Sequence, residues 1–97
     1  MTRDMTTAPQ LSVLLPAYNE EACIADVVRE VADVLRGVGR PFEIVVVDDG
    51  STDATSERLG ELQAGIPELR VLRLRRNSGQ SAALGAAFRA ARGEIFI

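Results

Sequence analysis

The sequence predicts an α/β domain in which four strands alternate with three helices around a mostly parallel sheet, in the order β-α-β-α-β-α-β. Short, nearly continuous apolar runs recur along the chain, as in strands buried on both faces. The segments between these runs are long enough for helices, which are the usual connections between parallel strands. The 97 residues leave room for one domain, so the pattern corresponds to half of a doubly wound, Rossmann-like sheet.

The first strand and helix follow a tail that has no periodicity. We expect residues 1–9 to be flexible and residues 10–97 to form the domain. Residues 11–15 are an apolar run that Pro16 ends, which predicts a buried strand. The helix that follows has Asn19 in the position of an N-cap. Its expected buried stripe consists of Ile24, Val27, Val28, Val31, Val34, Leu35 and Val38, with Gly37 and Gly39 at its end.

The second strand and helix are marked by a change from apolar to acidic residues. Residues 42–47 form a buried run that ends at two aspartates. A helix is expected at about residues 53–64, because Gly65 and Pro67 then stop it. Its inward side is predicted to carry Leu59, Leu62 and Ile66.

The last three elements are more polar or richer in small residues. Residues 69–74 predict a strand near the sheet edge, because Arg70 and Arg73 interrupt it. An alanine-rich helix at about residues 80–92 is expected to lie close to the sheet, and residues 94–97 begin a fourth strand. The predicted inner face of this helix consists of Leu84, Ala87, Phe88 and Ala91.

The composition excludes several kinds of chemistry. The chain has no His and a single cysteine, Cys23, so it can form neither an internal disulfide, nor a His/Cys metal cluster, nor a Ser-His-Asp triad. All eleven cationic residues are Arg, and the absence of Lys excludes a Walker A loop and Schiff-base catalysis.

The absence of a membrane span and of a signal peptide indicates a cytoplasmic protein, and charge is unevenly distributed along the chain. Residues 1–68 carry thirteen acids and five Arg, whereas residues 69–97 carry six Arg and one Glu. The basic third could meet phosphates, although a solvated face is the more common explanation. The sequence has neither a run of roughly 20 apolar residues for a membrane span nor a signal peptide. We expect no nucleic-acid partner.

Three polar loops follow the first three predicted strands. Because ligands bind at the carboxyl ends of strands in open parallel sheets, the loops are expected to form a binding site on one rim. These loops are residues 16–21, 48–53 and 75–79.

The pair Asp48 and Asp49 is the sharpest feature of these loops. Successive strand residues point to opposite faces, so one of the two can face a given ligand. That carboxylate could accept a ring N–H of uracil or guanine, or it could bind a divalent cation. The alternative is a turn at Asp49-Gly50, and for Asp53 we favour a role in capping the next helix.

The other loops offer an aromatic ring and an anion site. Tyr18 could stack on a base beside Pro16, and Glu20 could reach ribose hydroxyls, although each also has a structural explanation. The Arg75-Arg76 pair and the Asn77-Ser78-Gly79 turn at a helix N-terminus would suit a diphosphate.

Three motifs in order resemble family 2 glycosyltransferases of the GT-A fold, and the nearest branch is similar to the dolichyl- or polyprenyl-phosphate sugar transferases. The motifs are Leu-Pro-Ala-Tyr-Asn-Glu-Glu, Val-Val-Val-Asp-Asp-Gly-Ser-Thr-Asp-Ala-Thr and Arg-Asn-x-Gly-Gln-Ser-Ala-Ala-Leu. The resemblance covers about residues 10–97. It implies that the chain is the nucleotide-sugar-binding half of such a domain.

The resemblance also implies which residues contact the donor, a UDP- or GDP-sugar. The nucleotide would be held by Pro16, Ala17, Tyr18, Glu20, Val47, Asp48 and Asp49. The diphosphate or sugar would lie near Arg76, Asn77 and Gly79.

The family binds Mg²⁺ or Mn²⁺ with an Asp-x-Asp motif directly after its fourth strand. This motif and the catalytic base are missing from the 97 residues, so we expect a truncated domain with neither metal ligands nor catalytic residues of its own. Alone, it would bind nucleotide without turnover. A full-length form would use a lipid-phosphate or glycan acceptor and could lie on the cytoplasmic face of a membrane. The alternatives are a non-catalytic nucleotide-binding remnant or partner-binding module, and an exposed edge strand predicts self-association.

Overall fold

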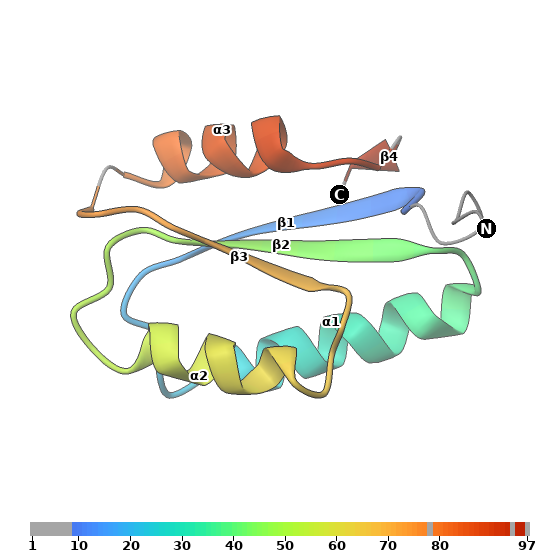
Figure 1. The fold of residues 1–97 in the computed structure, drawn as a ribbon, viewed down its shortest axis with the longest axis horizontal. Coiled ribbons are helices and arrows are strands. Elements are labelled where there is room, and N and C mark those ends of the chain that lie inside the picture. Colours follow the sequence, from blue (N-terminus) through green and yellow to red (C-terminus); the bar gives the residue numbers. More distant parts are fainter. Residues whose placement is uncertain (1–8, 78, 94, 97) are drawn as a thin grey trace.

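The computed structural model describes residues 9–77, 79–93 and 95–96. These residues form a four-stranded parallel sheet between two layers of helices (Figure 1). The expected tail, apart from Pro9, and the ends of the expected last strand, Glu94 and Ile97, lie outside the described residues. The elements are β1 Leu11–Ala17, α1 Ile24–Val38, β2 Phe42–Asp48, α2 Thr55–Gln63, β3 Leu69–Arg73, α3 Gln80–Ala90 and β4 Ile95–Phe96.

The strand order β3-β2-β1-β4 confirms the doubly wound α/β prediction. The chain steps from β1 to β2 to β3 with α1 and α2 on one face, and α3 then returns over the opposite face to β4 (Figure 1). Every strand pair is parallel. As predicted from its arginines, β3 lies at an edge of the described sheet. The reversal beside β1 is a topological switch point, where open α/β sheets bind ligands.

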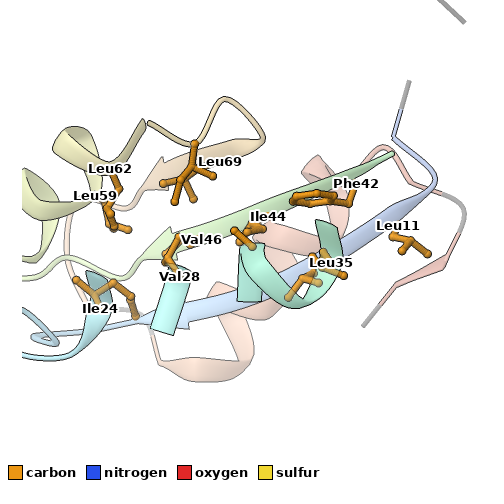
Figure 2. Packing of buried hydrophobic residues seen from close by; sticks show 14 residues of the cluster. Leu11, Ile24, Val28, Leu35, Phe42, Ile44, Val46, Leu59, Leu62 and Leu69 are labelled. Carbon is orange, nitrogen blue, oxygen red and sulfur yellow. The ribbon is translucent and has the colours of Figure 1, made fainter. Parts of the chain in front are cut away.

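Strand β2 lies inside the domain, and all seven of its residues are buried. Because side chains alternate along a strand, β2 serves two cores. Ile44 and Val46 belong to the large cluster under α1 and α2, shown in Figure 2. Val45 and Val47 belong to a smaller cluster under α3.

Helix α1 covers the sheet with a narrower stripe than the sequence predicts. Its buried residues are Ile24, Val28, Ala32 and Leu35. Three predicted core positions are wrong, because the side chains of Val27, Val34 and Val38 are exposed. Seven apolar positions on a 15-residue helix span more of its circumference than the sheet can cover, and the small Ala32 takes a place in the contact.

The predicted inner face of α3 is also partly wrong. Ala83 and Ala87 are buried on Val45 and Val47, whereas the larger Leu84 and Phe88 are exposed. The helix lies with its small residues toward the sheet, as its alanine content predicts. Compared with the predicted orientation it is rotated about its axis by one residue, so the large side chains point outward. Leu59, Leu62 and Ile66 are buried as predicted.

A buried carboxylate at the amino-terminal end of β2 joins β1, β2, β3 and the segment that follows α3. Glu43 is 2% exposed, and its Oε2 accepts hydrogen bonds from the Ser12 hydroxyl and the Arg92 backbone N–H, both at 2.6 Å. Its Oε1 accepts from Arg70 Nη1 at 2.9 Å and from Arg92 Nε at 3.4 Å. Burial alone would raise the pKa of Glu43, but these hydrogen bonds and the Arg70 charge outweigh it and lower the pKa.

The contrast between neighbouring α1 residues predicts unequal effects on stability. Leu35→Ala removes a buried side chain from the core, and we expect a loss of about 2–5 kcal/mol in the free energy of unfolding. Val34→Ala, on the exposed side, should change it by less than about 0.5 kcal/mol. Urea unfolding of both variants measures the difference, and equal losses would contradict the observed packing of α1.

The charged Glu43 predicts sensitivity to acid. Its pKa lies below the ordinary value of 4.5, so its contribution to stability is complete above that pH and is lost as the pH falls through the lower, folded-state pKa. We expect Glu43→Gln to be less stable than the wild type at pH 7, and the gap to narrow on acidification. Urea midpoints across this pH range test the effect. Asp53, whose pKa is also lowered, is present in both proteins, so a constant gap would exclude ionisation of Glu43 as the cause.

Candidate functional site

Parallel pairing brings the three predicted loops to one rim of the sheet. In the structure the first loop covers residues 18–23 and the second covers residues 49–54, each slightly later than predicted. Hydrogen bonds through Asn19 join these two loops. The Asn19 backbone N–H donates to Ser51 Oγ at 2.9 Å, and Asn19 Oδ1 accepts from the Thr52 N–H at 2.9 Å. Asn19 adopts a left-handed backbone conformation with φ 52°, which Asn tolerates better than most residues.

The predicted N-cap role of Asn19 is therefore wrong. Helix α1 begins at Ile24, and its N-cap position is Cys23. The intervening residues contact the start of α2 instead. The Glu20 N–H donates to Thr55 Oγ1 at 2.8 Å, and Glu21 Oε1 accepts from the Ala54 N–H at 2.9 Å. Long-range hydrogen bonds, rather than helix capping, set the shape of this loop.

Asp48 and Asp53 have structural contacts within the second loop. Asp48 is fully buried, and its Oδ1 accepts the Ser51 N–H at 3.0 Å, while its Oδ2 has no hydrogen-bond partner among the described residues. Asp53 accepts the Thr55 N–H and hydroxyl at the start of α2. The N-cap position of α2 is Ala54, so Asp53 binds the first helical N–H from the residue before the cap and is not the N-cap itself. Desolvation would raise the pKa of Asp53, but the Thr55 hydrogen bonds outweigh it and the pKa is lowered.

Asp49 faces the opposite side of the sheet, toward α3. It is 3% exposed, and its Oδ2 accepts the Gly79 N–H at 3.0 Å. The next residue, Gly50, has φ 75°, and a Cβ built on it would overlap the backbone of Arg76. The loops that follow β2 and β3 are thus in backbone contact, which glycine permits.

A pocket of about 430 Å³ lies between these loops, within the usual size range of small-molecule sites. Seven of the ten predicted nucleotide and diphosphate residues line it. Val47 and Asp48 are buried outside the lining, and Arg76 contributes the backbone contact beside Gly50. Gln80, the first residue of α3, was not predicted, although its position beside Gly79 could have indicated it. The lining consists of Pro16, Ala17, Tyr18, Glu20, Asp49, Asn77, Gly79 and Gln80.

A larger groove of about 640 Å³ lies between α1 and α2. Its walls include Arg29, Arg58, Asp33 and Glu61 from the helix surfaces, whereas the strand-end loops contribute only Glu21 and Ala22 beside α1. The smaller pocket is the better candidate site, because it lies at the carboxyl ends of the strands and beside the switch point.

The described residues hold neither a metal cluster nor a membrane span. In residues 9–77, 79–93 and 95–96, three or more Asp, Glu, Cys or His side chains do not come together in a form that could hold a metal ion. Within the same ranges, every helix is too short or too polar to cross a bilayer.

Comparison with known proteins identifies the family. Residues 12–97 match the sequence profile of Glycosyl transferase family 2, and the chain belongs to this family. Over 89 residues it is 43% identical to the undecaprenyl-phosphate 4-deoxy-4-formamido-L-arabinose transferase of Pseudomonas paraeruginosa, a match that covers 90% of this chain and 26% of the relative. The chain thus spans about a quarter of the length of the curated relatives it matches.

Solved structures have the same fold. TarS 1–349 of S. aureus in complex with UDP-GlcNAc superimposes with a TM-score of 0.74 at 34% identity, covering 91% of this chain and 26% of that one. The mannosyltransferase PcManGT of Pyrobaculum calidifontis, in complex with GDP-Man and Mn²⁺, superimposes with a TM-score of 0.71 at 32% identity, covering 94% and 27%. The predicted glycosyltransferase fold is confirmed.

The loop contact predicts opposite effects for two glycine substitutions. Gly50→Ala would place a Cβ in the backbone of Arg76 and force a left-handed alanine, which alone costs about 1–2 kcal/mol. Gly60→Ala lies in α2 with open space around it and should stabilise the chain by about 0.5–1 kcal/mol. Urea unfolding measures both, and an unchanged Gly50→Ala protein would contradict the contact between the loops.

Proposed function

We propose that the pocket binds the nucleotide of a UDP- or GDP-sugar, and that residues 10–97 are the donor-binding part of a glycosyltransferase domain. The observation that carries the proposal is the Asp49 carboxylate, which lines the pocket at the end of β2. A carboxylate accepts the ring N–H of uracil or guanine, whereas cytosine has an acceptor nitrogen at the corresponding position. An ionised carboxylate can accept about four hydrogen bonds, so a base can join the Gly79 N–H on Asp49.

The rest of the lining is consistent with a nucleotide. The Tyr18 side chain is 42% exposed, and it offers an aromatic face to a base. Glu20 can accept hydrogen bonds from ribose hydroxyls. Asn77 and Gly79 lie at the N-terminus of α3, where backbone N–H groups and the helix dipole favour phosphate. Arg76 adds a cation beside this end of the pocket.

The metal expected for a full-length enzyme has no fitting site in the described residues, because they gather no set of acidic ligands. Mn²⁺ is present with GDP-Man in the Pyrobaculum mannosyltransferase structure. We therefore propose that this chain binds nucleotide without a metal and does not transfer sugar alone. In a longer form, residues beyond these 97 would bind Mg²⁺ or Mn²⁺ and neutralise the departing diphosphate.

The relatives suggest the acceptor and the location. The Pseudomonas relative is named as a transferase for undecaprenyl phosphate. By this likeness, we propose that a full-length form transfers sugar to a polyprenyl phosphate on the cytoplasmic face of a membrane. We also propose self-association through an exposed edge strand, which the sequence places at the fourth strand, the edge of the described sheet opposite β3. At the β3 edge, Arg70 and Arg73 place charge on the strand and oppose pairing there.

Nucleotide titration with a charge-removing variant tests the role of Asp49. Isothermal titration of the wild type with UDP, GDP and CDP, without metal, should give binding of UDP or GDP in preference to CDP. Asp49→Asn should weaken the preferred nucleotide about 10- to 150-fold, the loss expected for one charge-assisted hydrogen bond. It should also remove the preference over CDP.

The matched control is Asp26→Asn, which removes a carboxylate that is 88% exposed on α1. It should bind as the wild type does. Equal affinity of the wild type for all three nucleotides, or no binding of any, would contradict the proposed site. The bound base would also identify the donor class.

A further inference from the structure

Helix α3 is held at both ends by two carboxylates on the same face of the sheet, Glu43 in β2 and Asp49 directly after it. Glu43 and Asp49 are six positions apart, so both point to the α3 side of the sheet. Both are buried, at 2% and 3% exposure. One of them lines the nucleotide pocket, and the other lies at the far end of the strand.

The contacts at the two ends are directional. At the N-terminal end, the Gly79 N–H donates to Asp49 Oδ2 at 3.0 Å. At the C-terminal end, the Arg92 N–H donates to Glu43 Oε2 at 2.6 Å. Arg70 Nη1 donates both to Glu43 Oε1, at 2.9 Å, and to the Ala90 carbonyl at the end of α3, at 2.8 Å.

Between these ends, the helix touches β2 through small apolar side chains. Ala83 and Ala87 pack on Val45 and Val47. Such contacts attract without direction, and methyl groups form a shallow surface along which a helix can shift. Hydrogen bonds to charged groups have narrow distance and angle limits. The two carboxylates therefore define the position of α3 along β2.

We propose that Glu43 is a positioning residue for the pocket: by fixing the C-terminal end of α3, it sets the position of the helix along β2 and so holds Gly79 against Asp49. Gly79 and Gln80 form one wall of the pocket, so a shift of α3 moves that wall relative to Tyr18. The inference about helix position stands on the contacts alone. Its consequence for ligand affinity rests on the proposed function.

Amide hydrogen exchange of the 97-residue chain tests the position of the helix. Glu43→Gln replaces one acceptor oxygen with an amide donor that faces other donors, so the C-terminal anchor loses its charge and one of its two accepting oxygens. We expect the Gly79 amide to exchange at least about tenfold faster than in the wild type. The Asp49 amide, which donates to the Ala17 carbonyl between β1 and β2, should stay within about twofold.

The control is Glu68→Gln, which removes another Arg-paired carboxylate, bound to Arg36 rather than to α3. It should leave Gly79 exchange unchanged. If Glu43→Gln raised the exchange rates of the Gly79 and Asp49 amides equally, Glu43 would contribute only to overall stability, and the proposal would be overturned. An unchanged exchange rate of the Gly79 amide would overturn it as well. If Glu43→Gln does not fold, Arg70→Met is the second variant: it removes the Arg70 hydrogen bonds to Glu43 and to the Ala90 carbonyl from a side chain that is one-third exposed. The exchange rates of the Gly79 and Asp49 amides are then compared in the same way.

A double-mutant cycle on UDP affinity then tests the link to the site. Glu43→Gln should weaken UDP about five- to tenfold in the wild-type background and less than about twofold in Asp49→Asn, because it acts through the Gly79–Asp49 contact. Equal losses in both backgrounds would overturn that link. If the wild type binds no nucleotide, the proposed function fails, while Gly79 exchange still decides the role of Glu43.

Discussion

The parallel pairing of β1 with β2 is the constraint on which the rest of the structure depends. Their residues pair one to one from Leu11 with Phe42 to Ala17 with Asp48, and the Asp49 N–H extends the ladder to the Ala17 carbonyl. Since parallel strands end on the same rim, this register brings two loops together there, and β3 adds a third. Helix α3 returns over the other face of the sheet (Figure 1), and Gly79 and Gln80 at its N-terminal end line the pocket.

Features that depend on local pattern could be predicted from the sequence. The strands could be located from their apolar runs, because a strand such as β2 is buried on both faces. Alternation of side chains along β2 also explains why Asp48 and Asp49 face opposite sides of the sheet. The loops after three parallel strands had to share a rim, so most of the predicted contact residues line one pocket. The three sequence motifs predicted membership of glycosyltransferase family 2, and the family is confirmed. The role of each pocket residue stays a prediction.

Features that depend on distant partners could not be predicted. From the local sequence Asn19 is predicted to be an N-cap. In the structure its hydrogen bonds go instead to Ser51 and Thr52, more than thirty residues away. The burial of Ala83 instead of Phe88 follows from how closely α3 approaches the sheet, which periodicity does not specify. Glu43 stands between apolar residues of a strand and gains its partners from three other segments of the chain.

The buried acids Glu43, in β2, and Asp49, directly after it, are better explained by geometry than by stability. Replacing a buried ion pair with apolar residues is often neutral or stabilising, so an aliphatic side chain at position 43 could extend the Val45 and Val47 core. It could not orient the Arg92 N–H or hold Arg70 at the end of α3. At position 49 the carboxylate lines the pocket and binds α3 at once. A helix that forms a wall of a polar pocket needs a defined position, and charged hydrogen bonds at both of its ends supply one that alanine packing does not.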